Sequence, residues 1–321
     1  MSCADGRGDR PPRILCAGIA VHDHVFGFER FPSPGSKTRA RSFAAVGGGC
    51  AANAAVAAAR LGAHAALAAP LGGSGGDDPI GDRILADLAR ERIDCSGVVR
   101  VAGATSPISA ILVDATGERL IVNHRDERLS DARVADPAAL VAGYDAVLVD
   151  NRFADFVLPL CAAARLRGIP VVLDGDRPTQ AAHALFAVCT HLVFAADGLR
   201  ATAQRDDLAD ALRLIGSQAA GFVAVTDGER GTLWLERGKV RRISAYPVDV
   251  VDTTGAGDVF HGAFVLALAE GQDEIAAMQF ATAAAALKCQ RFGGSAGAPI
   301  RAEVDAFMQR IGPAAVMSPS A

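Results

Sequence analysis

Short apolar runs alternate with stretches of helical periodicity along most of the chain. The apolar runs predict buried strands at residues 13–20, 146–150, 170–173, 191–194 and 222–226. The stretches between and after them predict helices at residues 54–62, 153–168, 209–219, 259–270 and 274–288. This alternation favours an α/β fold with a mostly parallel central sheet and helices on both faces.

Two stretches depart from the alternation and predict a second, smaller sheet. Residues 21–31 and 43–46 are separated by a turn rich in Pro, Ser and Gly, and residues 108–113 and 119–123 are joined by another turn. We expect these segments, about 21–46 and 106–124, to form a small sheet inserted in one domain of residues 13–321. Residues 1–12 are polar, and we expect a disordered lead-in there.

Composition narrows the class of protein. The chain has 321 residues, half of them hydrophobic, with a net charge of −4 and a pI of about 6.0, which argues against a nucleic-acid partner. No apolar run is long enough to span a membrane, and no secretory signal is visible. The seven cysteines form no Cys-x-x-Cys pair, so they indicate reduced thiols in a cytoplasmic protein rather than a zinc site.

The stretch with most chemical content is Asp252-Thr253-Thr254-Gly255-Ala256-Gly257-Asp258, which leads into a predicted helix. A glycine turn at a helix start leaves backbone N–H groups free to bind an anion. A carboxylate beside a bound phosphate makes sense if it removes a proton from an attacking hydroxyl. The simpler interpretation is that Asp258 caps the helix and that the glycines only turn the chain.

Other polar residues fall at or just past the carboxyl ends of the predicted strands, where open α/β sheets bind ligands. A Gly47-Gly48-Gly49 turn also precedes the helix that contains Asn53 and leaves backbone groups exposed there, and the alternative is an ordinary strand-to-helix loop. The strand-end residues are Asp23, Asn151, Arg152, Asp174, Asp176, Thr226 and Asp258.

Together these motifs resemble the ribokinase family, the phosphofructokinase-B type of carbohydrate kinase. The resemblance implies that Asp258 is the catalytic base and that the N–H groups of Gly255, Ala256 and Gly257 form an anion hole. It implies that Asp23, Gly48, Gly49 and Asn53 bind the sugar. It also implies that the smaller sheet, about 21–46 and 106–124, is a lid over the sugar, which often pairs two subunits in the family. For ATP it implies Thr226, Gly228 and Gly231 in the loop after residue 226, together with Gly255 and Gly257.

The resemblance also implies metal ions, and here the chain departs from the family pattern. Many members carry Asn-x-x-Glu after a mid-chain strand to organise Mg²⁺, but this chain has Ala195-Ala196-Asp197-Gly198. We therefore expect Mg²⁺ to be held by ATP, water and Asp174 or Asp176. In the family, a monovalent cation such as K⁺ would use Asp252 and Thr254, largely through carbonyl groups, with help from residues 292–297.

Three residues point to an anionic sugar. Lys37 lies in a lid turn, Asn123 ends a lid strand, and Arg152 follows a core strand, so a closed lid would bring them to one end of the substrate. In this respect the chain resembles the sulfofructose kinase branch, in which the matching residues hold the sulfonate of 6-deoxy-6-sulfofructose and ATP phosphorylates its C1 hydroxyl. Asn53 departs from that branch and is the residue that ribokinases have.

Several other functions remain open from the sequence. Within the family, the substrate alternatives are fructose, ribose, adenosine and 6-phosphosugars such as 6-phosphofructose, and Lys37 and Arg152 would serve a phosphate almost as well as a sulfonate. A non-catalytic sugar or nucleotide sensor would have no need for Asp258. A dehydrogenase is disfavoured because no Gly-x-Gly-x-x-Gly follows the first predicted strand.

Overall fold

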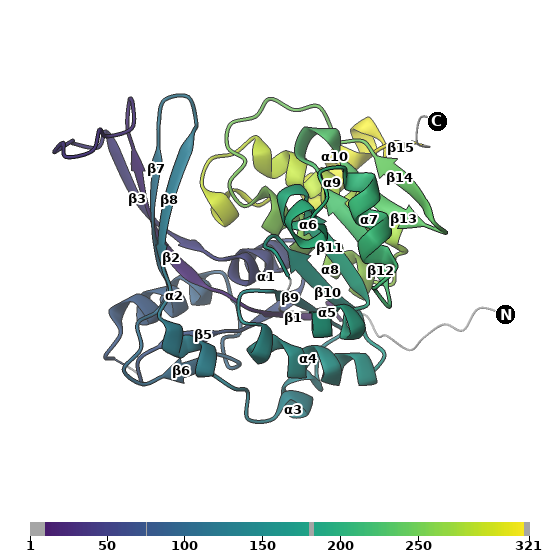
Figure 1. The fold of residues 1–321 in the computed structure, drawn as a ribbon, viewed down its shortest axis with the longest axis horizontal. Coiled ribbons are helices and arrows are strands. Elements are labelled where there is room, and N and C mark those ends of the chain that lie inside the picture. Colours follow the sequence, from purple (N-terminus) through teal and green to yellow (C-terminus); the bar gives the residue numbers. More distant parts are fainter. Residues whose placement is uncertain (1–9, 75, 180–182, 318–321) are drawn as a thin grey trace.

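The main sheet runs through the centre of the molecule (Figure 1). The protein is described by a computed structural model that covers residues 10–74, 76–179 and 183–317. Within these residues the sheet has nine strands in the order β15-β14-β13-β12-β11-β10-β9-β1-β4. The six strands from β12 through β11, β10, β9 and β1 to β4 run parallel to one another. The β12–β13, β13–β14 and β14–β15 pairs are antiparallel. The predicted mostly parallel sheet is therefore confirmed.

The strands of this sheet are short. The strands expected from the sequence differ from the observed ones by up to three residues at either end, and strands β4, β13, β14 and β15 were not predicted. The bounds are β1 Arg13–Ala17, β4 His64–Ala68, β9 Ala146–Asp150, β10 Val171–Gly175, β11 His191–Ala195, β12 Phe222–Thr226, β13 Thr232–Glu236, β14 Lys239–Ile243 and β15 Val316–Met317.

Helices cover both faces of the sheet, and its side chains divide accordingly between two cores. Ile14 and Leu148 belong to one core, and Leu15 and Val147 belong to the other. The first core contains residues of α1 Cys50–Arg60, α2 Pro79–Arg90, α8 Ala256–Ala269, α9 Glu274–Cys289 and α10 Arg301–Ile311. The second contains residues of α3 Pro137–Val141, α4 Ala154–Leu166, α5 His183–Val188, α6 Ala196–Ala203 and α7 Leu208–Gly216.

The small residues of α1 let it pack closely against α8. A Cβ atom on Gly262 of α8 would lie 2.5 Å from the carbonyl oxygen of Ala54 in α1, so only glycine fits at this crossing. This close packing brings the N-terminal ends of the two helices into one region, and both ends carry predicted site residues.

A separate four-stranded sheet stands away from the main body as the predicted lid (Figure 1). Its order is β3-β2-β7-β8, and only the β2–β7 pair is parallel. The bounds are β2 Val21–Gly27, β3 Ser42–Gly48, β7 Ile108–Val113 and β8 Arg119–His124. A two-stranded sheet of β5 Pro70–Gly72 and β6 Val99–Val101 was not predicted.

The remaining predictions concern the ends of the chain and its thiols. Residues 1–9 of the expected lead-in and 318–321 of the expected domain lie outside the described residues. Arg10 is held by two hydrogen bonds of 2.8 Å to the carboxylate of Asp145. The six cysteines that the structure describes are free thiols. Within the described ranges, no helix has the length and apolar character needed to cross a membrane.

Candidate active site

The turn that precedes α8 has the geometry expected of a glycine turn at a helix start. Gly255 adopts φ 76°, a left-handed conformation that favours glycine, and α8 begins at the next residue. Asp258 lies in the first turn of α8. The N–H group of Ala256 donates a hydrogen bond of 3.2 Å to the carbonyl oxygen of Thr253, so in this conformation that N–H group is already used within the turn.

The carboxylate of Asp258 is held by the side chain of Asn53 from α1. The Nδ2 group of Asn53 donates a hydrogen bond of 2.6 Å to Oδ2 of Asp258. Burial raises the pKa of Asp258, and the hydrogen bond from Asn53 opposes that shift. A carboxyl group with a raised pKa is a better proton acceptor than an ordinary aspartate. Two residues predicted for different roles, base and sugar ligand, are therefore direct partners.

The other predicted sugar residues lie around the start of α1. A Cβ atom on Gly48 would come within 2.0 Å of Oδ2 of Asp23, so a side chain at position 48 would displace this carboxylate. Gly49 adopts φ 95° as the residue before α1. Burial raises the pKa of Asp23, and a hydrogen bond from Ser109 opposes it. The two glycines thus place Asp23 beside the helix that carries Asn53.

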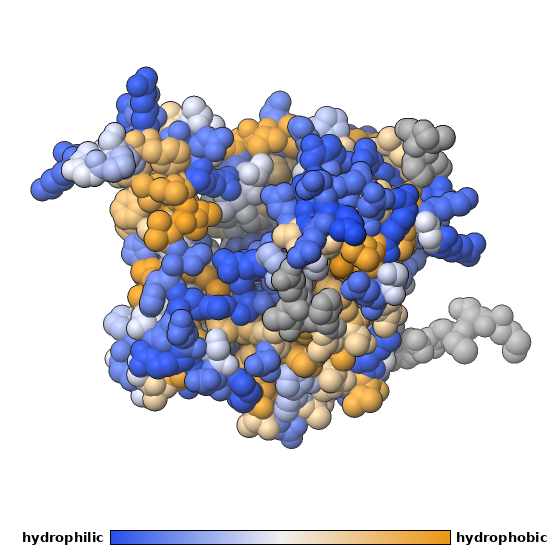
Figure 2. Space-filling view, in the orientation of Figure 1, coloured by the Kyte–Doolittle hydropathy of each residue, from blue (hydrophilic) through white to orange (hydrophobic). Residues whose placement is uncertain are grey.

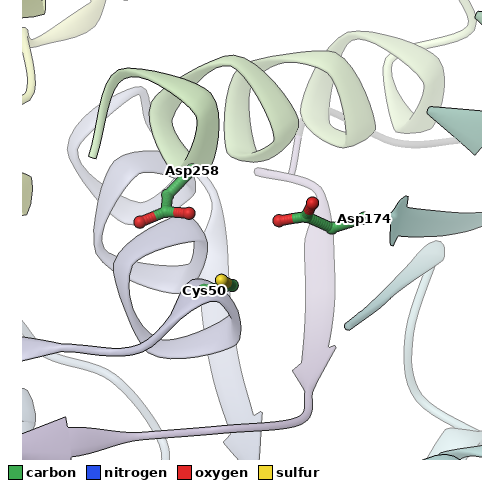
Figure 3. Close-up of side chains that lie close together, drawn as sticks. All are labelled: Cys50, Asp174 and Asp258. Atoms are coloured by element: carbon green, nitrogen blue, oxygen red, sulfur yellow. The ribbon is translucent and has the colours of Figure 1, made fainter. Parts of the chain in front are cut away.

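A thiol and two carboxyl groups come together at the centre of the site (Figure 3). Cys50 begins α1, Asp174 lies near the end of β10, and Asp258 lies in α8; their possible ligand atoms are all within 4.8 Å of one another. Burial, followed by the charges of Asp176 and Asp258, raises the pKa of Asp174 well above its ordinary value. Asp174 therefore holds its proton more strongly than an ordinary aspartate.

Arg152 is a buried partner of Asp176 rather than a solvated surface charge. Both terminal nitrogens of Arg152 donate to the carboxylate of Asp176, the second at 2.5 Å, and the Arg152 side chain is only 14% exposed. Burial alone would raise the pKa of Asp176, but the hydrogen bonds and charge of Arg152 outweigh it and lower the pKa. The thiol of Cys50 lies 3.8 Å from Arg152. Since both oxygens of Asp176 are used by Arg152, Asp174 is the more available of the two predicted Mg²⁺ ligands.

Comparison with known proteins supports the same function as this geometry. The sequence model of the pfkB family carbohydrate kinases matches residues 12–301 of this chain. The chain belongs to the pfkB family of carbohydrate kinases. It is accordingly an ATP-dependent sugar kinase, an enzyme that transfers a phosphoryl group to an alcohol.

The similar proteins of this family include several ribokinases. A ribokinase of Bacillus subtilis is 29% identical over 92% of this chain and 99% of its own length. One of Haemophilus influenzae is 30% identical over 92% and 98%. The crystal structure of a putative ribokinase from Agrobacterium tumefaciens is 38% identical, with a TM-score of 0.88 over 94% of this chain and 98% of that one. The predicted family and fold are confirmed, whereas the sulfofructose kinase branch stays a prediction.

The loop expected to bind the nucleotide of this pfkB kinase follows β12. Thr226 ends the strand, and its hydroxyl donates a hydrogen bond of 3.3 Å to the carbonyl oxygen of Phe194. Gly228 adopts φ 54° with open space around it. A Cβ atom on Gly231 would lie 2.0 Å from the carbonyl oxygen of Ile243, which gives Gly231 a structural reason to be glycine. The contacts of this loop with ATP stay a prediction.

The lid contributes the other two residues predicted to hold an anion. Asn123 of β8 pairs with Ser109 of β7, and Ser109 pairs with Asp23 of β2, so the three side chains share one face of the lid sheet. Lys37 lies exposed in the loop between β2 and β3. The side-chain hydrogen bonds described for Arg152 go to Asp176, Cys50 and Asn151. The convergence of Lys37, Asn123 and Arg152 on a substrate anion stays a prediction.

The residues expected to hold a monovalent cation already have partners. Thr254 donates to Oδ1 of Asp252 through its N–H group at 2.8 Å and through its hydroxyl at 2.6 Å. Burial would raise the pKa of Asp252, but the hydrogen bonds from Thr254 and Gly293 and the charge of Lys288 lower it well below its usual range. Arg119 of the lid also donates to Asp252 at 2.9 Å.

Three residues near the site were missed by the sequence analysis. Lys288 and Arg119 both contact Asp252, and Asp150 anchors the start of α1 by accepting hydrogen bonds from the N–H groups of Ile19 at 2.7 Å and Ala51 at 3.2 Å. Asp150 carries a recognisable signal, because it ends a predicted strand. Lys288 is the only charged residue after Glu274 in the predicted helix 274–288 and follows a run of mostly apolar residues, which indicates a buried cation.

Proposed function

We propose that this kinase phosphorylates 6-deoxy-6-sulfofructose on its C1 hydroxyl, using ATP, to give the 1-phosphate. The observation that supports an anionic substrate is the position of Arg152. Its guanidinium group lies against Cys50 at the start of α1, and one turn along the same helix Asn53 binds the proposed base Asp258. A neutral sugar has no use for a guanidinium group beside its site, whereas a sulfonate accepts two parallel hydrogen bonds from it.

The ion pair with Asp176 fits this proposal as the resting state of the site. Asp176 compensates the charge of Arg152, so the guanidinium is paired and mostly buried. A sulfonate that reaches Arg152 shares it with Asp176 or displaces Asp176, whose carboxylate is then free to accept a sugar hydroxyl. Lys37 and Asn123 supply further donors when the lid closes over the substrate.

The proposed reaction is direct in-line transfer. Asp258 accepts the proton of the attacking hydroxyl, and its raised pKa suits that role. The N–H groups of Gly255, Ala256 and Gly257 stabilise charge on the transferring phosphoryl group. For Ala256 this requires the hydrogen bond to Thr253 to be shared or broken. The closed lid excludes water, which would otherwise hydrolyse ATP.

The nucleotide is proposed to lie between the loop after β12 and the turn before α8. Thr226, Gly228 and Gly231 contact it from one side, and Gly255 and Gly257 contact its phosphates from the other. Mg²⁺, when bound, neutralises charge on the phosphate oxygens. Hard oxygen donors suit this ion, so of the cluster at the centre of the site the carboxyl group of Asp174 would help to hold it, and the thiol of Cys50 would not.

Ribose is the second candidate substrate, and the relatives favour it. The relatives described above are ribokinases, and the chain has Asn53, the residue that ribokinases have. On this alternative the ion pair of Arg152 with Asp176 is a fixed structural feature, and Asp176 never leaves Arg152 during turnover.

The deciding experiment compares sugars and an Arg152 variant. ADP release by the purified enzyme is measured with 6-deoxy-6-sulfofructose, fructose 6-phosphate, fructose and ribose at equal concentration. The proposal requires the highest kcat/KM with the sulfosugar. Arg152→Met then lowers that value by about 10- to 100-fold, the loss expected for hydrogen bonds to a charged group. Arg213→Met, which changes an exposed arginine of α7 in the same way, serves as the matched control.

Each outcome of this comparison has a distinct meaning. Equal loss of activity of Arg152→Met with sulfosugar and neutral sugar would mean that Arg152 only holds the site together. A preference for ribose would reject the anionic substrate and leave the sugar kinase intact. A preference for fructose 6-phosphate over the sulfosugar would keep the role of Arg152 and replace the sulfonate by a phosphate.

We also propose that the lid pairs two copies of the chain. Three large apolar side chains lie on one face of the lid sheet and are largely exposed, at 57% for Phe43, 52% for Leu120 and 59% for Val122. Figure 2 shows apolar side chains gathered along the lid. A contiguous apolar face of this kind is typical of a protein interface. A second copy of this chain presents the same face and is the occupant we propose.

A further inference from the structure

A fully buried lysine lies directly behind the turn that forms the start of α8. Lys288 is in the last turn of α9, and its side chain is 0% exposed. Its Nζ atom lies 2.8 Å from the carbonyl oxygen of Asp252, 3.2 Å from Oδ2 of Asp252 and 3.0 Å from the carbonyl oxygen of Arg291. An ammonium group has three N–H donors, and each one has an oxygen acceptor here.

Two of these oxygens belong to Asp252, which the family resemblance assigns to a monovalent cation, and the third, of Arg291, lies one residue before the assigned segment 292–297. Asp252 was expected to supply its carbonyl group, and residues 292–297 were expected to help. The structure instead places a protein ammonium group on the carbonyl oxygen and the carboxylate of Asp252. Arg119 adds a second positive charge at 2.9 Å from the same carboxylate. A free K⁺ ion would have to join two cations around one carboxylate, so these residues do not fit it.

We propose that Lys288 is a built-in cation that takes the place of the monovalent ion, so that this kinase works without K⁺. Because the ammonium group belongs to a side chain of α9, it is always present beside Asp252, whatever the concentration of ions in solution. The proposal concerns how the phosphate-binding turn is held and does not depend on which sugar the enzyme phosphorylates.

The hydrogen bonds around Lys288 show what such a cation holds together. The carbonyl oxygen of Cys289, the next residue, accepts from the N–H groups of Val251 at 2.8 Å and Asp252 at 3.1 Å. The N–H group of Gly293 donates to Oδ2 of Asp252 at 3.1 Å. Lys288 therefore joins the end of α9, the segment after residue 290 and the turn that leads to Gly255. It acts as a positioning residue for that turn.

Within the described ranges, one carboxylate compensates the buried charge of Lys288. A buried ammonium group is costly unless it is paired and hydrogen-bonded, and here the compensating carboxylate is that of Asp252. Asp252 in turn receives the N–H group and hydroxyl of Thr254, two residues before Ala256. The lysine, the aspartate and the turn thus form one continuous network that ends at the proposed anion hole.

The first test uses the unmodified enzyme and measures ion dependence directly. ADP release is measured by chromatography with the Tris salt of ATP, in choline chloride and in KCl at equal ionic strength, with whichever sugar is turned over. The melting temperature is recorded in the same two salts without sugar, so that this readout survives if no sugar is turned over. We expect the rate to differ by less than about twofold and the melting temperature to be the same. Activation by K⁺ of tenfold or more would overturn the proposal.

The second test removes the ammonium group in two ways. Lys288→Ala leaves space beside Asp252, and we expect its rate in choline chloride to fall by at least about tenfold. We expect KCl to restore most of that rate and to raise its melting temperature. Lys288→Met fills the space without a charge and should lose activity in both salts. Lys239→Met, which changes an exposed lysine of β14, is the matched control.

The ion response separates this proposal from a purely structural role for Lys288. If Lys288→Ala folds and its rate and melting temperature are the same in KCl and choline chloride, the site does not accept a cation and the proposal is wrong. If Lys288→Ala does not fold, the salt comparison on the unmodified enzyme decides alone. If Lys288→Met is restored by KCl as fully as Lys288→Ala, the ion acts elsewhere, which also contradicts the proposal.

Discussion

Asn53 Nδ2 lies 2.6 Å from Asp258 Oδ2, although the two residues are 205 positions apart in the chain. This hydrogen bond joins the first turn of α1 to the first turn of α8. A donor to the carboxylate stabilises its charged form, whereas burial destabilises that form. The basicity of Asp258 is therefore set by two opposing effects, one of which a single substitution can remove.

Removal of the Asn53 amide should move the acid limb of the pH–rate profile. Asn53→Ala deletes the donor that lowers the pKa of Asp258, so the pKa should rise and the limb should shift to higher pH. The measurement is kcat as a function of pH with saturating sugar. Gln218→Ala, at an exposed position after α7, is the control and should leave the limb in place. A shift to lower pH would contradict the assigned role of this hydrogen bond.

Replacement of the base itself should stop turnover without unfolding the protein. Asp258→Asn keeps the shape of the side chain but cannot accept the proton, and loss of a general base slows a reaction by about 10²- to 10⁴-fold. Because burial disfavours the charged carboxylate, its removal should not lower the melting temperature. Asp197→Asn, whose side chain is 99% exposed in α6, should retain full activity. A near-normal kcat for Asp258→Asn would remove Asp258 from its role.

The lid interface can be tested by one charge on its apolar face. Val122→Lys places a positive charge among exposed apolar side chains, and the charge would have to be buried if two lids pack together. Sedimentation should then show a dimer for the unmodified enzyme and a monomer for the variant. Leu166→Lys changes a leucine of α4 that is 90% exposed, and it should stay dimeric. Equal mass for all three proteins would leave the lid with no role in assembly.

The sequence was sufficient for the parts of this fold that have strong local signals. Buried parallel strands such as Ala146–Asp150 consist almost wholly of apolar residues, and the turn at Gly255 lies in a seven-residue motif that resembles the family signature. Strands β13 and β14 were missed because β14 carries several charged residues and because both depend on antiparallel pairing, β13 with β12 and β14 with β13 and β15. The lid was predicted because its strands alternate around recognisable turns.

The site was harder to predict, because side-chain pairs depend on packing between distant elements. The sequence indicated Arg152 and Asp176 separately, one as an anion ligand and the other as a metal ligand, and gave no sign that they bind each other. It indicated Asp252 as a cation ligand but not that Lys288, 36 residues later, reaches the same oxygens. The first contact joins the segments that follow the paired strands β9 and β10, and the second joins the end of α9 to a loop, so local periodicity carries little information about either.

Arg119 links the lid to the turn before α8, and its removal should weaken closure over the sugar. This first residue of β8 donates to Oδ1 of Asp252 at 2.9 Å and to the hydroxyl of Thr253 at 3.3 Å. Because Arg119 is 29% exposed, the contact is worth about 1 kcal/mol, so Arg119→Gln should lower kcat/KM for the sugar by about fivefold. The loss should appear in KM for the sugar and not in KM for ATP, and it should shrink at high salt because the ion pair of the unmodified enzyme is screened. Arg213→Gln on α7 is the control, and a loss confined to KM for ATP would mean that Arg119 serves the nucleotide and not the lid.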